Sequence, residues 1–445
     1  MGKNVSFPKE VCILAIPVAL QCMLQSSFSI IDQIMIGQLG SINIAAIGLA
    51  GKFSSIFSVI LGAIGAVAGI MISQYIGSKN REEAHKSLSL NMITALVISF
   101  IFMALCVIFP SSIMGMYSTD NNTISVASEY LRIISFTFLP LAVTTCLSTM
   151  LRCINKAMIP LYASIAAALC NTGINYLLIF GKFGFPQMGV NGAALATVIA
   201  SYINMCIVII GLIYVYNKNK IKFSFSVKLS KMTPKQYFSI LFPILITEFL
   251  WSLGENVYAA IYGHLGTDGC AAMTLTAPIQ GLMIGALSGI SQAAGIMIGK
   301  KLGERDYDTA YKNSKRFMMY GFVGSLILAF LLIVLRSYYT GIYNVEDYVR
   351  EVGNQLLFVF AVVSPVKVMN MILGGGIIRS GGKTKIIMWI DIIGTWGFGV
   401  PLGLLSAFYF NLPITYVYFI LSLEEIVRLV ISFVVFKKRI WIKSL

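Results

Sequence analysis

Charged residues are scarce in this sequence. They make up 11% of the 445 residues, whereas apolar residues make up 57%. Soluble globular proteins carry about 25% charged residues, so this chain has less than half the usual share. The composition therefore excludes a soluble globular protein, a disordered chain, collagen, a coiled coil and a disulfide-rich secreted module.

Histidine is almost absent, and the cysteines show no metal-binding spacing. The chain has two histidines, His85 and His264, and eight cysteines without a CxxC pair. We interpret the cysteines as small buried hydrophobic residues, most of them within apolar runs. Because the sequence offers no metal cluster and no nucleophile–base pair, we expect the protein not to be an enzyme and to need no cofactor.

What the sequence contains in quantity is long apolar runs. We predict twelve membrane-spanning helices, from residues 11–36 to residues 413–436, because a spanning helix needs about 20 mostly apolar residues. Most lysines and arginines lie in alternate loops and in both tails, and the opposite loops hold only Lys182, Arg336 and Arg350. The positive-inside bias therefore predicts a multi-pass protein of the cytoplasmic (plasma) membrane with both termini in the cytoplasm.

The net charge of +15 comes largely from these basic loops. We interpret the basic runs as a topology signal beside anionic lipid headgroups rather than as a nucleic-acid surface. We therefore expect membrane lipids as partners, no nucleic acid, and a monomeric protein.

The sequence repeats itself at an offset of 226 residues. AGIMI occurs at 68–72 and again at 294–298, and GQLG at 37–40 matches GHLG at 263–266. Each repeat holds six predicted helices, an even number, so both repeats enter the membrane from the same side. Parallel repeats of this kind are typical of transporters with alternating access, and they make a channel less plausible.

The repeat predicts an all-α polytopic membrane protein with two six-helix lobes. We place the boundaries within the polar stretch between the sixth and seventh helices. The predicted parts are an N-lobe at 1–215, a cytoplasmic linker at 216–235 and a C-lobe at 236–445.

One acidic residue stands out in the first predicted helix. Asp32 lies two-thirds of the way along it, with no basic residue on the same helix. A charged side chain at bilayer depth costs at least about 2.5–3.5 kcal/mol, so it marks a functional site by default. A lone buried carboxylate either takes up a proton or binds a cation, and both properties suit ion coupling.

The fifth and sixth predicted helices carry further oxygen ligands. Asn171 and Asn175 are four residues apart and share a helix face, and Thr197 adds a hydroxyl on the next helix. Amide and hydroxyl oxygens are ligands that hard cations prefer. The alternative is hydrogen bonding between helices without an ion.

The C-terminal half has its own charges within predicted helices. Glu255 shares one face of the seventh helix with Trp251 and Tyr258. A carboxylate among aromatic rings suits an organic cation, although core aromatics with one satisfied acid would give the same pattern. We expect Lys367 to neutralise Asp391 on the following helix, and Glu424 to pair with Arg428 four residues later.

Together these features resemble the multidrug and toxic compound extrusion (MATE) family. The resemblance covers nearly the whole chain, and its motifs are DQIMIGQLG from Asp32, MLRCINKAMIP around Arg152, NTGINYLLIFG, GVNGAALAT, and GIIRSGGKTK at 376–385. It implies a V-shaped exporter of twelve helices in two lobes. Members expel organic, often cationic, compounds in exchange for Na⁺ or H⁺.

The resemblance also implies a cation site in the N-lobe. NorM-like members use a helix 1 aspartate, two helix 5 asparagines, a helix 6 threonine and a nearby backbone carbonyl. These positions match Asp32, Asn171, Asn175, Thr197 and Ala193 here, as ligands for Na⁺. DinF-like members have an aspartate where Asn175 stands, so this chain resembles the NorM-like branch more closely.

The C-lobe departs from the NorM-like pattern. The helix 7 glutamate of that branch matches Glu255, but its helix 10 acidic partner is missing, because helix 10 offers only Lys367 and Asn370. Asp391, on helix 11, is not one of the positions of the pattern.

We predict a secondary active antiporter that exports organic, mainly cationic, compounds in exchange for Na⁺ or H⁺. Its substrate cavity is expected to include Glu255, Trp251, Tyr258, Asp391 and Lys367. The alternative is a flippase for lipids or polysaccharide precursors of the same superfamily. A flippase for anionic carriers should line its cavity with arginine and lysine, whereas here carboxylates balance the single lysine.

Overall fold

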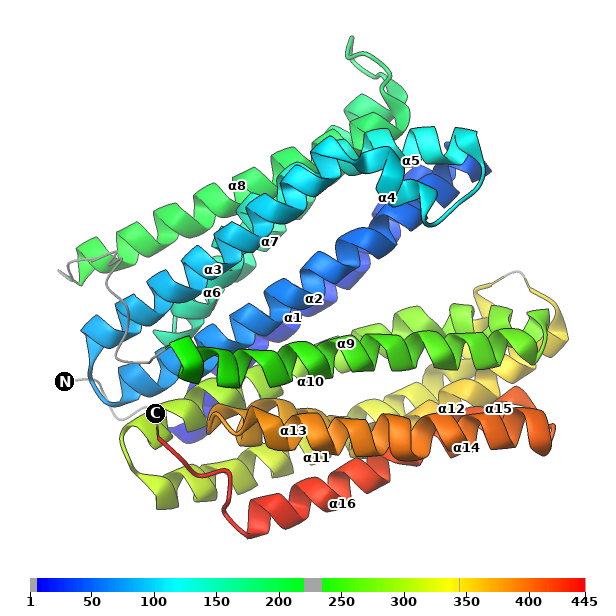
Figure 1. The fold of residues 1–445 in the computed structure, drawn as a ribbon. Coiled ribbons are helices and arrows are strands. Elements are labelled where there is room, and N and C mark those ends of the chain that lie inside the picture. Colours follow the sequence, from blue (N-terminus) through cyan, green and yellow to red (C-terminus); the bar gives the residue numbers. More distant parts are fainter. Residues whose placement is uncertain (1–5, 220–233, 344, 445) are drawn as a thin grey trace. The chain divides into compact units, whose positions relative to one another are not determined.

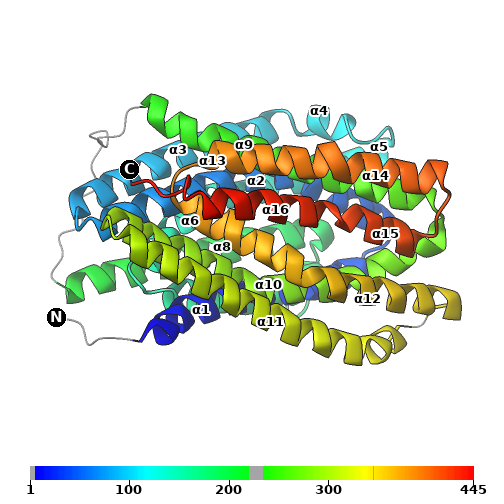
Figure 2. The same cartoon turned by 90° about the horizontal axis from the view of Figure 1, so that it is seen from below.

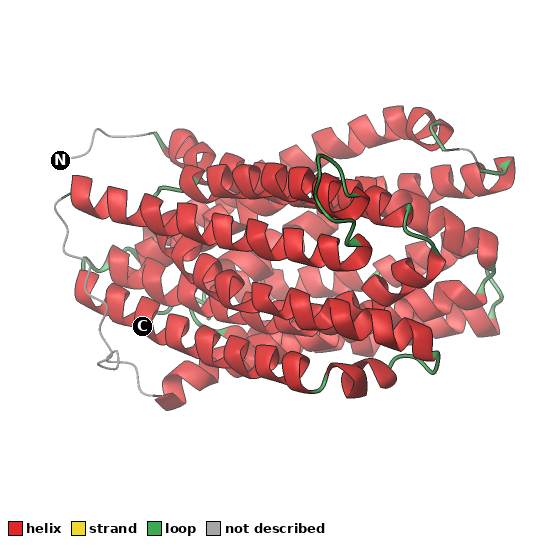
Figure 3. Cartoon of the chain, turned by 90° about the horizontal axis from the view of Figure 1, so that it is seen from above, coloured by secondary structure: helices red, strands yellow, loops and turns green. Residues whose placement is uncertain are grey.

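The computed structural model describes residues 6–219, 234–343 and 345–444, and these residues form helices without any β-strand (Figure 3). Eleven helical segments are long and apolar enough to cross a membrane. The twelfth predicted span is present as two shorter helices, α15 (Ile414–Ser422) and α16 (Glu424–Lys437). The predicted all-α fold with twelve spans is therefore confirmed, while most of the predicted linker at 216–235 lies outside the described residues.

The first half of the chain contains eight α-helices and one 3₁₀ turn (Figure 1). The turn η1 (Ser135–Thr137) joins α5 to α6, so these two helices form one span. The bounds are α1 (Phe7–Gly37), α2 (Ser41–Gly77), α3 (Arg81–Ile108), α4 (Pro110–Gly115), α5 (Asn121–Ile134), α6 (Phe138–Cys153), α7 (Met158–Phe180) and α8 (Gly189–Lys218).

The second half differs by containing π-helical segments. All three π-helices of the described residues lie there, each continuous with an α-helix: η2 (Met371–Ile378), η3 (Ile392–Gly399) and η4 (Leu405–Tyr409). The α-helices before α15 are α9 (Pro234–His264), α10 (Thr267–Gly303), α11 (Tyr307–Gly341), α12 (Asp347–Asn370), α13 (Thr384–Asp391) and α14 (Val400–Leu404).

The structure reproduces the sequence repeat helix by helix. Helices α2 and α10 both have 37 residues, and their first residues are 226 positions apart. The same offset separates the starts of α3 and α11 and of α7 and α13. Even a helix cap is repeated, because Asn80 accepts a hydrogen bond from the N–H of Glu83 at 3.2 Å and its equivalent Asp306 accepts one from Thr309 at 3.2 Å.

The chain divides into two compact units. We call Met23–Ile72 with Asn80–Thr233 the N-unit, and Met1–Cys22, Ser73–Lys79 and Pro234–Leu445 the C-unit. The start of α1 and the end of α2 thus belong to the C-unit. The predicted lobe boundaries take no account of this exchange and remain a sequence-based division.

Glycines explain why the end of α2 belongs to the C-unit. A Cβ atom at Gly77 would collide with the backbone of Lys300 on α10, and one at Gly303 would collide with the backbone of Gln74 on α2. Gly303 is the repeat equivalent of Gly77, and Lys300 is that of Gln74. The two helix ends therefore touch backbone to backbone in a reciprocal contact that tolerates no side chain at either glycine.

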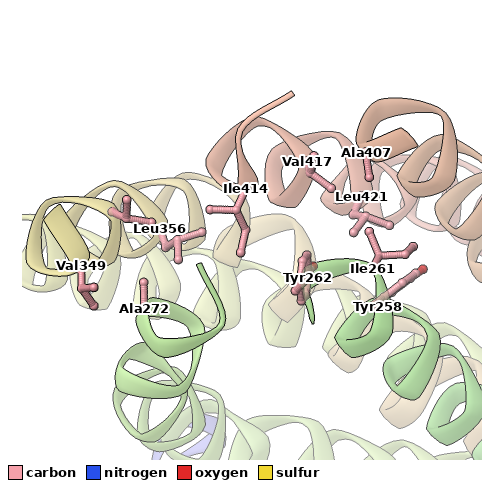
Figure 4. Packing of buried hydrophobic residues seen from close by; sticks show 11 residues of the cluster. Tyr258, Ile261, Tyr262, Ala272, Val349, Leu356, Ala407, Ile414, Val417 and Leu421 are labelled. Carbon is pink, nitrogen blue, oxygen red and sulfur yellow. The ribbon is translucent and has the colours of Figure 1, made fainter. Parts of the chain in front are cut away.

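Within the C-unit, α10, α11 and α12 lie side by side (Figures 1 and 2). Figure 4 shows a buried apolar cluster in which side chains from α9, α12 and α15 converge, including Ile261, Leu356 and Val417. Tyr258 and Tyr262 lie in the same cluster and are each 8% exposed. This packing fixes the position of α9, and with it the polar groups that α9 carries.

Candidate functional site

Three helices of the N-unit bring the predicted cation ligands together. Asp32 lies near the end of α1, Asn171 and Asn175 lie on α7, and Thr197 lies on α8. Helices α7 and α8 pack closely because Gly192 rests against the backbone of Leu178, where a Cβ atom would approach to 2.8 Å. This close approach sets Thr197 beside the α7 amides.

A chain of hydrogen bonds links the predicted residues. Asn175 Nδ2 donates to Asp32 Oδ1 at 2.9 Å and to Asn171 Oδ1 at 3.2 Å. Asn171 Nδ2 donates to Thr197 Oγ1 at 3.2 Å, and that hydroxyl donates to the backbone oxygen of Ala193 at 3.0 Å. One carboxylate, two amides, a hydroxyl and a carbonyl thus lie in one continuous polar strip, which is a set of oxygen atoms suited to a hard cation.

The two amides of the strip are buried, and no cation of the described residues pairs with its carboxylate. Asn171 and Asn175 are 9% and 1% exposed, and Asp32 is half-buried. Among the described residues, Asp32 forms no ion pair, and its titratable neighbour is the phenol of Tyr130 on α5. An ionised carboxylate in this setting is costly, so the site favours either protonation or a bound cation.

The Asn171 amide has two orientations related by half a turn about its side-chain axis. With its nitrogen on Thr197, the amide places its oxygen 2.9 Å from Asp32 Oδ1. Turned by half a turn, the amide donates to both carboxylate oxygens, at 2.9 and 3.2 Å, and accepts from the Thr197 hydroxyl at 3.2 Å. The second orientation gives the Asn171 amide hydrogen bonds to both Asp32 and Thr197.

The C-unit contains a second polar cluster of a different kind. Glu424 and Arg428 on α16 form the predicted ion pair at 3.3 Å, and the Tyr258 hydroxyl donates to Glu424 at 2.5 Å. Arg428 also donates to the Thr395 hydroxyl on η3 and lies 3.7 Å from Asp391. Here the buried carboxylates have cations as neighbours, in contrast to Asp32.

Comparison with known proteins identifies the family to which this architecture belongs. The MatE family model matches residues 17–177 and 243–405, so it fits the chain twice, with starts 226 residues apart. The chain belongs to the MatE family. This family and the membrane-spanning helices are those that the resemblance implied.

Relatives span nearly the whole chain. YisQ of Bacillus subtilis, named an uncharacterized transporter, is 22% identical and covers 96% of this chain and 94% of its own. A probable multidrug resistance protein NorM of Agrobacterium fabrum is 25% identical, with 92% and 88% covered. The NorM relatives agree with the NorM-like assignment.

Solved structures share the fold. The crystal structure of MATE in complex with MaL6 has a TM-score of 0.88 at 17% identity, covering 97% of this chain and 96% of that chain. The structure described as an outward-facing conformation of a multidrug resistance MATE family transporter of the MOP superfamily has a TM-score of 0.87 at 18% identity. The match covers 97% of this chain and 95% of that chain.

Within this MatE member, the residues predicted to line a substrate cavity lie in different surroundings. Trp251 is 49% exposed and Glu255 is also exposed, whereas Tyr258 is buried and bonded to Glu424. Lys367 is half-buried and its electrostatic partners include Glu425 and Glu255. The seventh predicted helix therefore presents an accessible part at Trp251 and Glu255 and a buried part at Tyr258.

The expected pairing of Lys367 with Asp391 is wrong. Asp391 faces Arg428, because α16 packs against η3, and among the described residues Lys367 makes no ion pair within 4.0 Å. The sequence pattern gave no means of choosing between two cations on different helices. The packing of α16 determines which cation lies beside Asp391.

Sequence reasoning missed two polar contributors to the C-unit cluster. Asn370 donates from Nδ2 to the Glu425 carboxylate at 2.8 Å and to its backbone oxygen at 2.6 Å. Thr395 accepts from Arg428 within the π-helix η3. The glycine-rich run around Thr395 was a local signal of unusual helix geometry that could have drawn attention to it.

Proposed function

We propose that this protein is a secondary antiporter that exports organic cations in exchange for Na⁺ or H⁺, with Asp32 as the coupling carboxylate. The observation that carries the proposal is the chemistry around Asp32, where amide and hydroxyl groups approach the carboxylate and no described cation pairs with it. Occupancy of this site by an ion and of the transport pathway by substrate then compete across the cycle.

The accessible face of α9 supports an organic cation as cargo. The Glu255 carboxylate and the Trp251 ring are both exposed one helical turn apart, and a cation can interact with charge and ring at once. A flippase for anionic lipid carriers would need positive charge there. The half-buried Lys367 lies instead among acidic groups, so the flippase alternative is not favoured.

The test is efflux from proteoliposomes under separately imposed Na⁺ and pH gradients, with a fluorescent cationic dye as cargo. Asp32→Asn keeps the size of the side chain and removes its charge, so it should reduce gradient-driven efflux to the level of empty vesicles. Undiminished coupled efflux by Asp32→Asn would contradict the assignment.

Glu129→Gln is the matched control for that test. Glu129 is an exposed acid in the same unit that accepts a hydrogen bond from Asn191 at 3.0 Å, much as Asp32 does from Asn175. Removal of its charge should leave coupled efflux unchanged. An equal loss in both variants would show that the assay responds to general damage and not to coupling.

We also propose that both termini face the cytoplasm, on the basis of the basic loops. With native cysteines replaced, a cysteine at Met116, which is 85% exposed between α4 and α5, should react with impermeant thiol reagents in intact cells. A cysteine at Asn217, near the end of α8, should not react. The reverse pattern would contradict this orientation.

A further inference from the structure

Among the described residues, the polar cluster inside the C-unit has four carboxylates and three cations, with the exposed Glu255 left outside it. Glu248 pairs with Arg379 and Glu424 pairs with Arg428, each at 3.3 Å, and the strongest electrostatic attraction on Lys367 comes from Glu425. Asp391 is the charge that remains.

Asp391 is also the carboxylate with the fewest stabilising hydrogen bonds and ion pairs. Glu424 accepts a hydrogen bond from Tyr258 at 2.5 Å, and Glu425 accepts one from Asn370 at 2.8 Å. Within the part of the chain that the structure describes, the ion-pair partner of Asp391 is Arg428 alone, at 3.7 Å, which is beyond hydrogen-bond distance, and Arg428 is shared with Glu424. The anionic form of Asp391 is therefore the least stabilised of the three.

Charged groups face Asp391 from each element packed around it, and they cancel one another. Arg428 and Glu425 approach from α16, Arg379 from the end of η2, and Glu248 from α9. Two cations and two carboxylates leave no net charge to balance that of Asp391. One proton on Asp391 makes the set neutral, which is the less costly state for a cluster inside the membrane.

The position of Asp391 allows a proton to enter and leave. Its side chain is 23% exposed, whereas that of Glu424 is 8% exposed. Asp391 is the last residue of α13, and the π-helix η3 begins at the next residue. Short π-helical segments occur frequently at functional sites, where the wider turn re-aims side chains.

We propose that Asp391 is a second exchangeable proton site, built into the C-unit and separate from the Asp32 strip in the N-unit. When the proton leaves, Asp391 becomes an anion, and Arg428 is then shared between two carboxylates on different helices, α13 and α16. This inference goes beyond the coupling role proposed for Asp32. It concerns proton binding itself, so it stands or falls without any measurement of transport.

Infrared spectroscopy of the carboxyl C=O stretch tests the proposal directly. The protein is made by cell-free synthesis with ¹³C-carboxyl-labelled aspartate and carries Asp32→Asn, so that Asp391 is the remaining aspartate within a span. The other five aspartates lie at or next to helix starts. A ¹³C-shifted band of a protonated, weakly solvated carboxyl should appear and vanish reversibly as pH is varied between about 4 and 9.

Two further variants identify the source of the band. In the same background, Asp391→Asn should abolish the band. Asp391→Glu keeps the charge beside Arg428 and should return the band without its isotope shift, which also covers the case in which Asp391→Asn fails to fold. Asp347→Asn, at an acid whose side chain is 96% exposed and paired with Arg350, is the matched control and should change nothing.

The same spectra would overturn the proposal in either of two ways. One is the absence of a labelled, reversibly titrating band in the Asp32→Asn protein. The other is a labelled band that persists when Asp391 is replaced. Failure of dye efflux would count against the antiport proposal alone, because the infrared titration uses neither a gradient nor a substrate.

Discussion

Asp32 in the N-unit and Asp391 in the C-unit are both carboxylates within membrane-spanning helices, but their neighbours differ in kind. Asp32 accepts a hydrogen bond from the neutral amide of Asn175. Asp391 lies among arginines and glutamates. Neutral donors can turn to follow a change of charge at low cost, whereas a network of fixed charges is rebalanced only as a whole. The two copies of the repeat therefore differ in the groups that stabilise an acidic side chain inside the membrane.

Replacement of Arg428 should show most clearly that the Asp391 site depends on a cation, whereas the Asp32 site has none. Arg428→Met leaves Glu424 and Asp391 buried without their shared partner, and loss of one member of a buried ion pair costs about 3–5 kcal/mol. We expect a marked fall in the thermal unfolding temperature in detergent.

The control for that experiment is Arg350→Met at the surface. Arg350 pairs with Asp347, whose side chain is 96% exposed, and exposed pairs contribute about 0–1 kcal/mol. The contrast between the two arginines is the expected result. An equally small effect of Arg428→Met would mean that Glu424 and Asp391 are protonated and do not need the positive charge of Arg428 for stability.

A change in helix packing should damage only the N-unit site. Gly192→Ala pushes a methyl group into the backbone of Leu178 and separates α8 from α7, at a cost of about 1–3 kcal/mol for overpacking. Thr197 moves with α8, so Na⁺ affinity, measured by calorimetry, should fall.

Gly173→Ala on α7 is the matched control, because no atom lies within 4 Å of the added methyl group. It should be neutral or slightly stabilising, since alanine favours a helix over glycine. Equal losses of Na⁺ affinity in both variants would contradict the role given to the close approach of α7 and α8.

A change at Asn175 should distinguish Na⁺ from H⁺ at Asp32. Asn175→Ala removes an oxygen ligand and a donor to the carboxylate, which is worth about 1.5–3 kcal/mol, or roughly tenfold or more in Na⁺ affinity. A proton needs no such ligand, so proton-driven efflux should persist in part. Na⁺ affinity should also fall as pH falls, since a proton and Na⁺ compete for one carboxylate.

A Na⁺ affinity that is independent of pH, or unchanged by Asn175→Ala, would place the ion elsewhere. Asn191→Ala serves as the control for loss of an asparagine, because Asn191 lies in the same unit and bonds to the exposed Glu129. It should leave Na⁺ binding unchanged.

The sequence predicted the fold from local patterns, and the structure brings the predicted N-unit residues together, whose role as a cation site stays a prediction. The apolar runs define the spans, and the four-residue spacing of Asn171 and Asn175 places both on one face of α7, where the structure has them. The pairing of Asp391 was predicted wrongly, because it depends on how α16 packs against the π-helix η3. The hydrophobic periodicity of the sequence does not predict this π-helix. The exchange of helix ends between units depends likewise on a tertiary contact at Gly77.

The reciprocal contact of α2 and α10 has a consequence for the origin of the chain. Gly77 touches Lys300 while its equivalent Gly303 touches Gln74, so the same pair of positions meets twice with the partners exchanged. Self-complementary contacts of this form are what a two-fold symmetric dimer makes. Two identical six-helix chains inserted in the same direction could associate through this patch, and fusion of their genes would then preserve it. The contact between α2 and α10 therefore has the form of an interface between two copies of one six-helix unit, although both copies lie in a single polypeptide.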